Sequence, residues 1–232
     1  MEITICERWT VYVPPPTESW FLDWVLRAPK DSGIHLTAGL CAYRALAGLE
    51  FRSVVEYFGG MGAQSLMIRD LFDPIDHYVF DCSAEAVKHI QDQIDGVTAK
   101  EADSYTQHVP ADLVGLDFGD LTVWKTREGE KHRDLLDRVF AGHPEGVVLT
   151  DVACRYLHLH RERYETLLGD GSCSSYPAYL EALADRLEAL YGYVMVGGFY
   201  HRWSTVMALA PEGKRAPFLP TPSSPVGLQV SS

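Results

Sequence analysis

The chain has 232 residues, 47% hydrophobic and 22% charged, which fits one large domain or two small ones and excludes fibrous, collagen-like and wholly disordered proteins. Its 20 Lys and Arg against 32 Asp and Glu give a net charge of −12, which disfavours nucleic acid as a partner. No apolar run reaches the ~20 residues of a transmembrane helix, and the acidic start of the chain does not resemble a signal peptide. The five Cys are odd in number and form no C-x-x-C, so we expect reduced thiols in a cytoplasmic protein without a membrane anchor.

Helix-like and strand-like patterns alternate from residue 34 onward. In chain order, we expect a helix over 34–49, a strand over 51–58, a helix over 63–72, a strand over 77–80, a helix over 84–94, strands over 97–102 and 112–116, a helix over 131–141, a strand over 146–150, helices over 156–168 and 179–190, and strands over 193–196 and 205–209. Residues 197–202 are too short a connection for a crossover, so we expect the last two strands to be antiparallel. The pattern predicts a three-layer α/β domain with a mostly parallel sheet that ends in an antiparallel hairpin.

Two segments outside residues 51–210 differ in composition from this domain. Residues 1–50 include a run of three Pro at 14–16 and an aromatic stripe with helical spacing at Trp20, Phe21 and Trp24. We interpret the segment and its helices as a lid or cap, and packing in the core is the alternative for the stripe. Residues 211–232 contain five Pro and four Ser, which predicts an extended or disordered tail. Docking of the tail on a protein partner is the alternative.

The first strand of the domain runs into a glycine-rich turn, residues 58–62, at the start of a helix. Glycines at this place let the backbone turn tightly and approach a ligand, while the helix N-terminus presents free N–H groups. Asp81 ends the next strand, about 20 residues after the glycines, where a carboxylate can accept both hydroxyls of a ribose. The sequence therefore predicts a nucleoside site.

The details of the turn argue against a dinucleotide. The third place of a G-x-G-x-x-G motif is Ser65 here, and Glu56 puts a negative charge just before the turn. A carboxylate at this place suits a ligand with a cationic group better than a pyrophosphate. A nicotinamide-dependent oxidoreductase is therefore the less favoured of the nucleotide-binding enzymes.

Glu56, the turn at 58–62, Asp81, Asp103 and Asp117 together resemble the successive motifs of class I S-adenosylmethionine-dependent methyltransferases, over roughly residues 51–210. The resemblance implies a Rossmann-like fold with a seven-stranded sheet and S-adenosyl-L-methionine as cofactor. It also implies that Glu56 and Gly60 to Gly62 face the methionine moiety, that Asp81 holds the ribose, that Cys82 and Asp103 flank the adenine, and that Asp117 borders the methyl group. The expected cofactor-binding residues are Glu56, Phe58, Gly59, Gly60, Gly62, Asp81, Cys82, Asp103 and Asp117.

Methyl transfer is an in-line displacement in which the protein aligns the acceptor and, for some acceptors, removes a proton. Asp117 and Asp120 are the candidate bases, and His158 is a third candidate with no partner visible in the sequence. We expect no metal site, because His158 and His160 would point to different faces of a helix.

Asp117-Phe118-Gly119-Asp120 lacks the Pro pair of amino-methyltransferases that act on nucleic-acid bases, and no Cys follows a Pro as in cytosine-C5 enzymes. The hypothesis is methyl transfer to an unidentified acceptor, a small molecule or a macromolecule. The alternatives are a non-catalytic binding or assembly protein on the same fold and the oxidoreductase.

Overall fold

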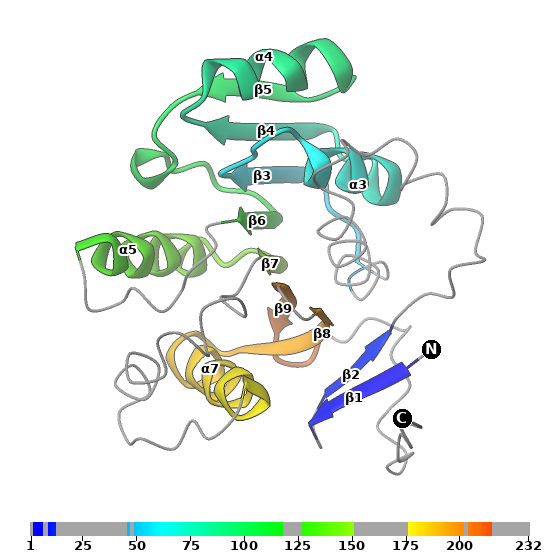
Figure 1. Cartoon of the computed structure of the whole chain (residues 1–232), viewed down its shortest axis with the longest axis vertical. Coiled ribbons are helices and arrows are strands. Elements are labelled where there is room, and N and C mark those ends of the chain that lie inside the picture. The colour runs from blue at the N-terminus through cyan, green and yellow to red at the C-terminus, as the bar shows by residue number, and fades with distance from the viewer. Residues whose placement is uncertain are drawn as a thin grey trace.

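The computed structural model describes residues 2–6, 9–12, 46, 49–117, 127–150, 176–201 and 204–214. These residues form a seven-stranded sheet in the order β5-β4-β3-β6-β7-β9-β8 and a separate two-stranded sheet, β1-β2. Figure 1 shows the seven strands stacked in this order from top to bottom. The expected helices at 34–49 and 156–168 lie outside the described residues, apart from Leu46 and Leu49, as does the tail beyond residue 214.

The elements follow the predicted alternation. The strands are β1 (Glu2–Cys6), β2 (Trp9–Tyr12), β3 (Ser53–Tyr57), β4 (Asp76–Asp81), β5 (Thr98–Glu101), β6 (Leu113–Asp117), β7 (Gly146–Thr150), β8 (Tyr193–His201) and β9 (Ser204–Pro211). The helices are α3 (Ala63–Phe72), α4 (Ala84–Gln93), α5 (Arg127–Ala141) and α7 (Tyr176–Tyr191), with a 3-10 turn, η1 (Ser104–Thr106). All seven strands that the sequence predicted are present, whereas the β1–β2 hairpin was not predicted.

The predicted antiparallel pair at the end of the sheet is confirmed, but its first strand, β8, is longer than predicted. Strand β9 is antiparallel to both β7 and β8, so it lies between two strands rather than at the edge. Residues 197–201, which the sequence analysis assigned to the hairpin connection, belong to β8. The register of the β8–β9 pair shifts between Met195 and Gly197, so the Gly197-Gly198 pair adjoins a bulge inside the strand and does not form the turn.

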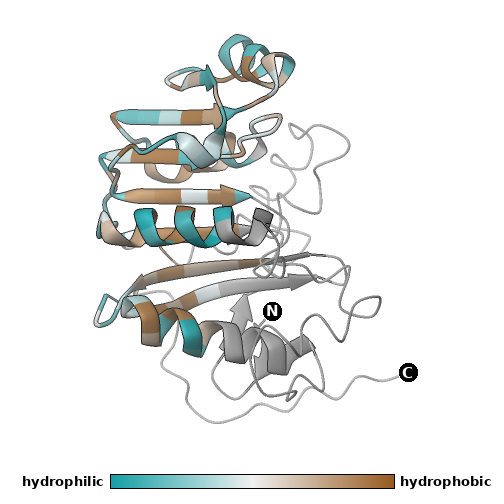
Figure 2. Cartoon of the chain, turned by 90° about the vertical axis from the view of Figure 1, so that its left-hand side faces the viewer, coloured by the Kyte–Doolittle hydropathy of each residue, from teal (hydrophilic) through white to brown (hydrophobic). Residues whose placement is uncertain are grey.

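Helices cover both faces of the sheet, which makes three layers. Alternate residues of a strand point to opposite faces: Val55 packs in a buried cluster with Leu136 of α5 and Leu187 of α7, and Val54 packs with Ile68 of α3. A third cluster joins β4 and β5 to α4. Figure 2 shows apolar residues along the strands, with hydrophilic residues on the helices around them.

Local sequence signals set the limits of helices α3 and α4. Helix α3 begins after Gly62, whose φ is +79°, and ends at Asp73, before Pro74. The N-cap of helix α4 is Ser83, whose hydroxyl accepts a hydrogen bond from Ala86 N at 3.3 Å. Among the described residues, no helix is long and apolar enough to cross a membrane.

The order of strands reverses beside β3. The chain runs from β3 to β4 and β5 on one side, then returns to β6 on the other side of β3. In open α/β sheets, ligands bind beyond the carboxyl ends of the strands at such a reversal. The fold therefore directs attention to the turn that follows β3.

Candidate functional site

Two acids flank the carboxyl end of the central strand. The last residue of β3, Tyr57, lies opposite Phe80 of β4 and Leu116 of β6. Asp81 and Asp117 are each the next residue along their strands, so they stand one step beyond the end of β3, one on each side. The turn that leaves β3 thus begins between two carboxylates.

Asp81 is bound directly to the glycine turn. Its Oδ2 accepts a hydrogen bond from Gly60 N at 2.8 Å, and its Oδ1 accepts one from Ser83 N at 2.8 Å. Asp81 is half-buried, and a carboxylate has about four lone-pair positions, so it can accept further bonds from a ligand. The turn and the acid, separated in sequence, form one site.

The three glycines of the turn serve different purposes. A Cβ on Gly59 would lie 2.1 Å from Val79 Cγ1, and one on Gly62 would lie 2.6 Å from Ile94 Cδ1, so both glycines allow close packing. Gly60 has φ +51°, and a Cβ there would meet no atom of the described residues within 4 Å. Of the three, Gly60 is the one that borders open space, where a ligand can approach the backbone.

Phe58 occupies a position that normally favours glycine. Its φ is +63°, a left-handed conformation that is costly for a bulky side chain. Its N–H donates to the hydroxyl of Ser104 at 3.0 Å, and that hydroxyl donates to Phe80 O at 3.2 Å. The ring of Phe58 packs edge-on against Tyr105, with the centroids 5.0 Å apart. These contacts from η1 hold the strained residue in place.

Glu56 lies inside the protein, one residue before the end of β3. Its side chain is 1% exposed, and its Oε1 lies 2.6 Å from Nε2 of His77, which is itself fully buried. Glu56 precedes the turn, as expected, whereas no role was predicted for His77. The only sequence signal for His77 was a histidine within a strand that otherwise reads as buried.

The other expected site residues take varied positions. Cys82 is exposed beside Asp81, and Asp103 is exposed at the start of η1, where its Oδ1 accepts a hydrogen bond from Tyr105 N at 3.0 Å. Asp117 is half-buried at the end of β6. Asp120 and His158 lie outside the described residues.

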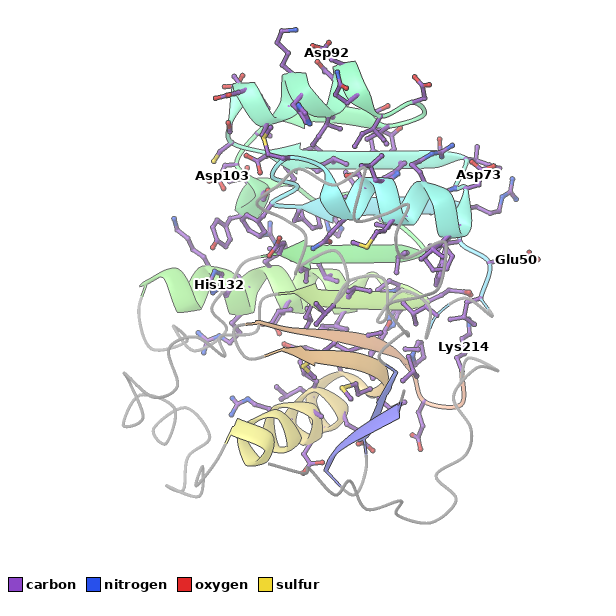
Figure 3. All side chains as sticks on the ribbon, turned by 45° about the vertical axis from the view of Figure 1, so that its right-hand side comes forward. Glu50, Asp73, Asp92, Asp103, His132 and Lys214 are labelled. Atoms are coloured by element: carbon purple, nitrogen blue, oxygen red, sulfur yellow. The ribbon has the colours of Figure 1, made fainter. Side chains whose placement is uncertain are left out.

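A cluster that the sequence analysis missed joins η1 to α5. The hydroxyl of Tyr105 and Nε2 of His132 are 2.5 Å apart, their rings stack, and Lys131 Nζ lies 5.5 Å from the centre of the Tyr105 ring. An open hollow of about 470 Å³ borders the cluster, lined by Tyr105, Lys131, Asp134, Asp137 and Arg138. In Figure 3, Asp103 and His132 lie at the carboxyl side of the sheet, whereas Glu50, Asp73 and Lys214 lie at the opposite side.

The strand ends are acidic. The segments 56–62, 81–84, 101–104 and 115–117 contain Glu56, Asp81, Glu101, Asp103 and Asp117 but no Lys or Arg. This charge favours a ligand with a cationic group and opposes a pyrophosphate. Within the described parts of the chain, no group of three or more His, Cys, Asp and Glu is placed to hold a metal ion.

Comparisons by sequence find no match: no family model fits the chain, and no curated protein is similar to it. Solved structures do match. The plantazolicin methyltransferase BpumL, in complex with a desmethylplantazolicin analogue and S-adenosylhomocysteine, is 10% identical with a TM-score of 0.53, over 85% of this chain and 91% of that one.

Two further structures agree with this match. Magnesium protoporphyrin IX methyltransferase from Synechocystis PCC 6803, with bound S-adenosylhomocysteine, is 15% identical with a TM-score of 0.52, over 84% of this chain and 95% of that one. The N-methyltransferase NodS from Bradyrhizobium japonicum WM9 is 11% identical with a TM-score of 0.50, over 84% and 99%. The chain therefore has the fold of the class I S-adenosylmethionine-dependent methyltransferases.

Proposed function

We propose that this protein is a cytoplasmic methyltransferase that binds S-adenosyl-L-methionine at the carboxyl end of β3 and methylates an unidentified acceptor. The observation that carries the proposal is the 2.8 Å hydrogen bond from Gly60 N to Asp81 Oδ2, at the point where the strand order reverses. It joins a backbone facing open space to a carboxylate able to hold a ribose. Two of the structural neighbours bind S-adenosylhomocysteine, which supports this cofactor.

The residues present fit the cofactor. The remaining lone pairs of Asp81 would accept the ribose hydroxyls, and the open face of Gly60 leaves room for the ligand to lie against the main chain. Cys82 and Asp103 are both exposed at neighbouring strand ends, which supports the adenine contacts that the resemblance implies. The acidic strand ends favour a group that carries both a sulfonium and an ammonium.

When bound, the cofactor supplies an electrophilic methyl group for in-line displacement. Asp117 stands across the end of β3 from Asp81, where its carboxylate would orient the acceptor or take its proton. Asp120 and His158 remain candidates for the same step. The net charge of −12 favours an acceptor other than nucleic acid.

The first experiment is calorimetric titration of the purified chain with S-adenosylmethionine, S-adenosylhomocysteine and NADH. We expect micromolar binding of the first two, weakened in Asp81→Ala by about 2–3 kcal/mol because a charge-assisted bidentate hydrogen bond is lost. Asp76→Ala is the matched control, since Asp76 is an exposed acid at the other end of the same strand and should leave binding unchanged.

Each other outcome has a definite meaning. Binding of NADH alone would make the protein an oxidoreductase and would reject the proposal. Binding of none of the three would favour a non-catalytic assembly protein on this fold. Equal loss of binding in Asp81→Ala and Asp76→Ala would reject the ribose site at Asp81.

A further inference from the structure

Glu56 and His77 form a buried pair next to the proposed cofactor site. Nε2 of His77 lies 2.6 Å from Oε1 of Glu56, and the two side chains are 0% and 1% exposed. A carboxylate oxygen accepts hydrogen bonds, and the tautomer of His77 with its proton on Nε2 fits this contact. Strand alternation places Glu56 on the α3 face of the sheet with Val54, and His77 on the same face as Val79.

This pair leaves hydrogen-bonding capacity unused. Oε2 of Glu56 and Nδ1 of His77 are both buried and have no hydrogen-bond partner among the described residues. A buried carboxylate oxygen without a donor is costly, and the cost is larger when the group is charged. Such an atom, one residue before the end of β3, is suited to a ligand that brings its own donor.

The sheet register places His77 farther from the glycine turn than Glu56. Glu56 lies opposite Val79 of β4, whereas His77 lies opposite Val54, two residues nearer the start of β3. His77 therefore contacts Oε1 from a position nearer the start of β3, away from the glycine turn. Oε2 is the oxygen of this carboxylate that no described residue contacts by a hydrogen bond.

We propose that His77 is a positioning residue, which fixes the Glu56 carboxylate so that Oε2 receives the ammonium group of the methionine half of the cofactor. This inference rests on the proposed function and deepens it. The chemistry recognised at this point is a primary ammonium on a nucleoside ligand. Without the bond from His77, the carboxylate is free to rotate and the ammonium loses a fixed acceptor.

The test compares two ligands on the same protein. S-adenosylmethionine carries the ammonium group, whereas 5′-methylthioadenosine has the same nucleoside but lacks the amino-acid half. In His77→Asn, the shorter amide does not reach Glu56, and we expect about tenfold weaker binding of S-adenosylmethionine, with 5′-methylthioadenosine changed less than about twofold. In His77→Gln, the amide N–H reaches the place of Nε2, and we expect the affinity for S-adenosylmethionine to return to within about threefold of the wild type.

The ratio of the two affinities is the readout, because a purely structural role would change both ligands alike. His89→Asn on α4 is the matched control and should change neither affinity. Equal effects on both ligands, no effect, or equal damage by Asn and Gln to the ratio would overturn the role of His77.

Two further results keep the test decisive. If neither His77 variant folds, Glu56→Gln retains an oxygen for the His77 donor but removes the charge, and unchanged binding of S-adenosylmethionine there overturns the inference. If the wild type binds neither ligand, the proposed function itself fails. If the wild type binds both equally tightly, only the inference fails.

Discussion

Gly60 and Gly62 both have a positive φ, but they are required for different reasons. A side chain at Gly62 would collide with Ile90 and Ile94 of the α4 layer, whereas a side chain at Gly60 would project into open space beside Asp81. Gly62 therefore serves the packing of the fold, and Gly60 serves the approach of a ligand.

The first prediction at the residue scale separates binding from strain. Gly60→Val puts a β-branched residue at φ +51°, which costs about 1–2 kcal/mol of stability, and fills the space where the ligand would lie. We expect folded protein by circular dichroism and no binding of S-adenosylmethionine by calorimetry. Gly192→Val is the matched control, because Gly192 has φ +71°, meets nothing within 4 Å and follows α7. Retained binding in Gly60→Val would contradict the site.

The second residue-scale prediction concerns alkaline pH. Burial raises the pKa of Tyr193 from 10.0 to about 12, and its hydroxyl donates to Pro144 O at 2.7 Å. Because the folded pKa lies above the unfolded value, this contribution to the free energy of unfolding is present below pH 10 and is lost as the pH rises towards 12.

Tyr193→Phe should cost about 1 kcal/mol at neutral pH, through the lost hydrogen bond. Its free energy of unfolding should also fall less steeply than that of the wild type above pH 10. Denaturant unfolding measured at several pH values tests both points. Parallel curves for the two proteins would rule out the contribution of this hydroxyl.

At the scale of elements, η1 stabilises the glycine turn through hydrogen bonds. The hydroxyl of Ser104 accepts from Phe58 N and donates to Phe80 O, and so ties the turn to β4. We expect Ser104→Ala to lose about 1–2 kcal/mol of stability and to weaken nucleoside binding, because Phe58 N is left without its acceptor.

Ser53→Ala provides the comparison for this prediction. Its hydroxyl accepts a hydrogen bond from Asp112 N at 3.0 Å, at the opposite end of β3 from the turn. Ser53→Ala should lower the melting temperature without changing the affinity for the nucleoside. Thermal unfolding and calorimetry of the two variants measure this difference, and equal affinities in both would show that the hydrogen bonds of η1 do not serve the site.

Most described elements could be predicted from local patterns. Helix α3 has the predicted limits, since Gly62 starts it and Asp73-Pro74 stops it. Strand β8 was predicted too short, because Gly197-Gly198 reads as a turn in sequence and only the partner strand reveals a bulge. The hairpin of β1 and β2 was also missed, as its pairing joins two short stretches with no clear turn signal.

The candidate site, too, could be predicted only in part from the sequence. The position of Asp81 beside the turn could be predicted, because parallel strands bring their carboxyl ends to one edge of the sheet. The pairing of Glu56 with His77, and of Phe58 with Ser104 and Tyr105, could not be predicted, because side-chain contacts between distant segments leave no periodic signal.

At the scale of the whole molecule, the helices on both faces of the sheet pack against its buried strands. Leu209 of β9 is fully buried in the cluster that includes Leu136 of α5 and Leu187 of α7. We expect Leu209→Ala to lower the free energy of unfolding by about 2–5 kcal/mol through lost burial and a cavity. Leu190→Ala at the exposed end of α7 should change it by less than about 0.5 kcal/mol, since Leu190 is 54% exposed. Denaturant unfolding tests this, and similar losses in the two variants would contradict a core centred on the sheet.

The hydrogen bonds at the glycine turn have a consequence for which residues the turn requires. The donors are main-chain N–H groups of Phe58, Gly59 and Gly60, and the acceptors are the Ser104 hydroxyl, Phe80 O and the Asp81 carboxylate. Main-chain geometry can persist while side chains are replaced, and here a phenylalanine holds a left-handed conformation in the turn. The turn therefore requires its glycines and the acceptors of Ser104 and Asp81, whereas position 58 holds a bulky side chain. Few positions are constrained in this way, and the chain shares its fold with solved structures of only 10–15% identity although no family model matches it.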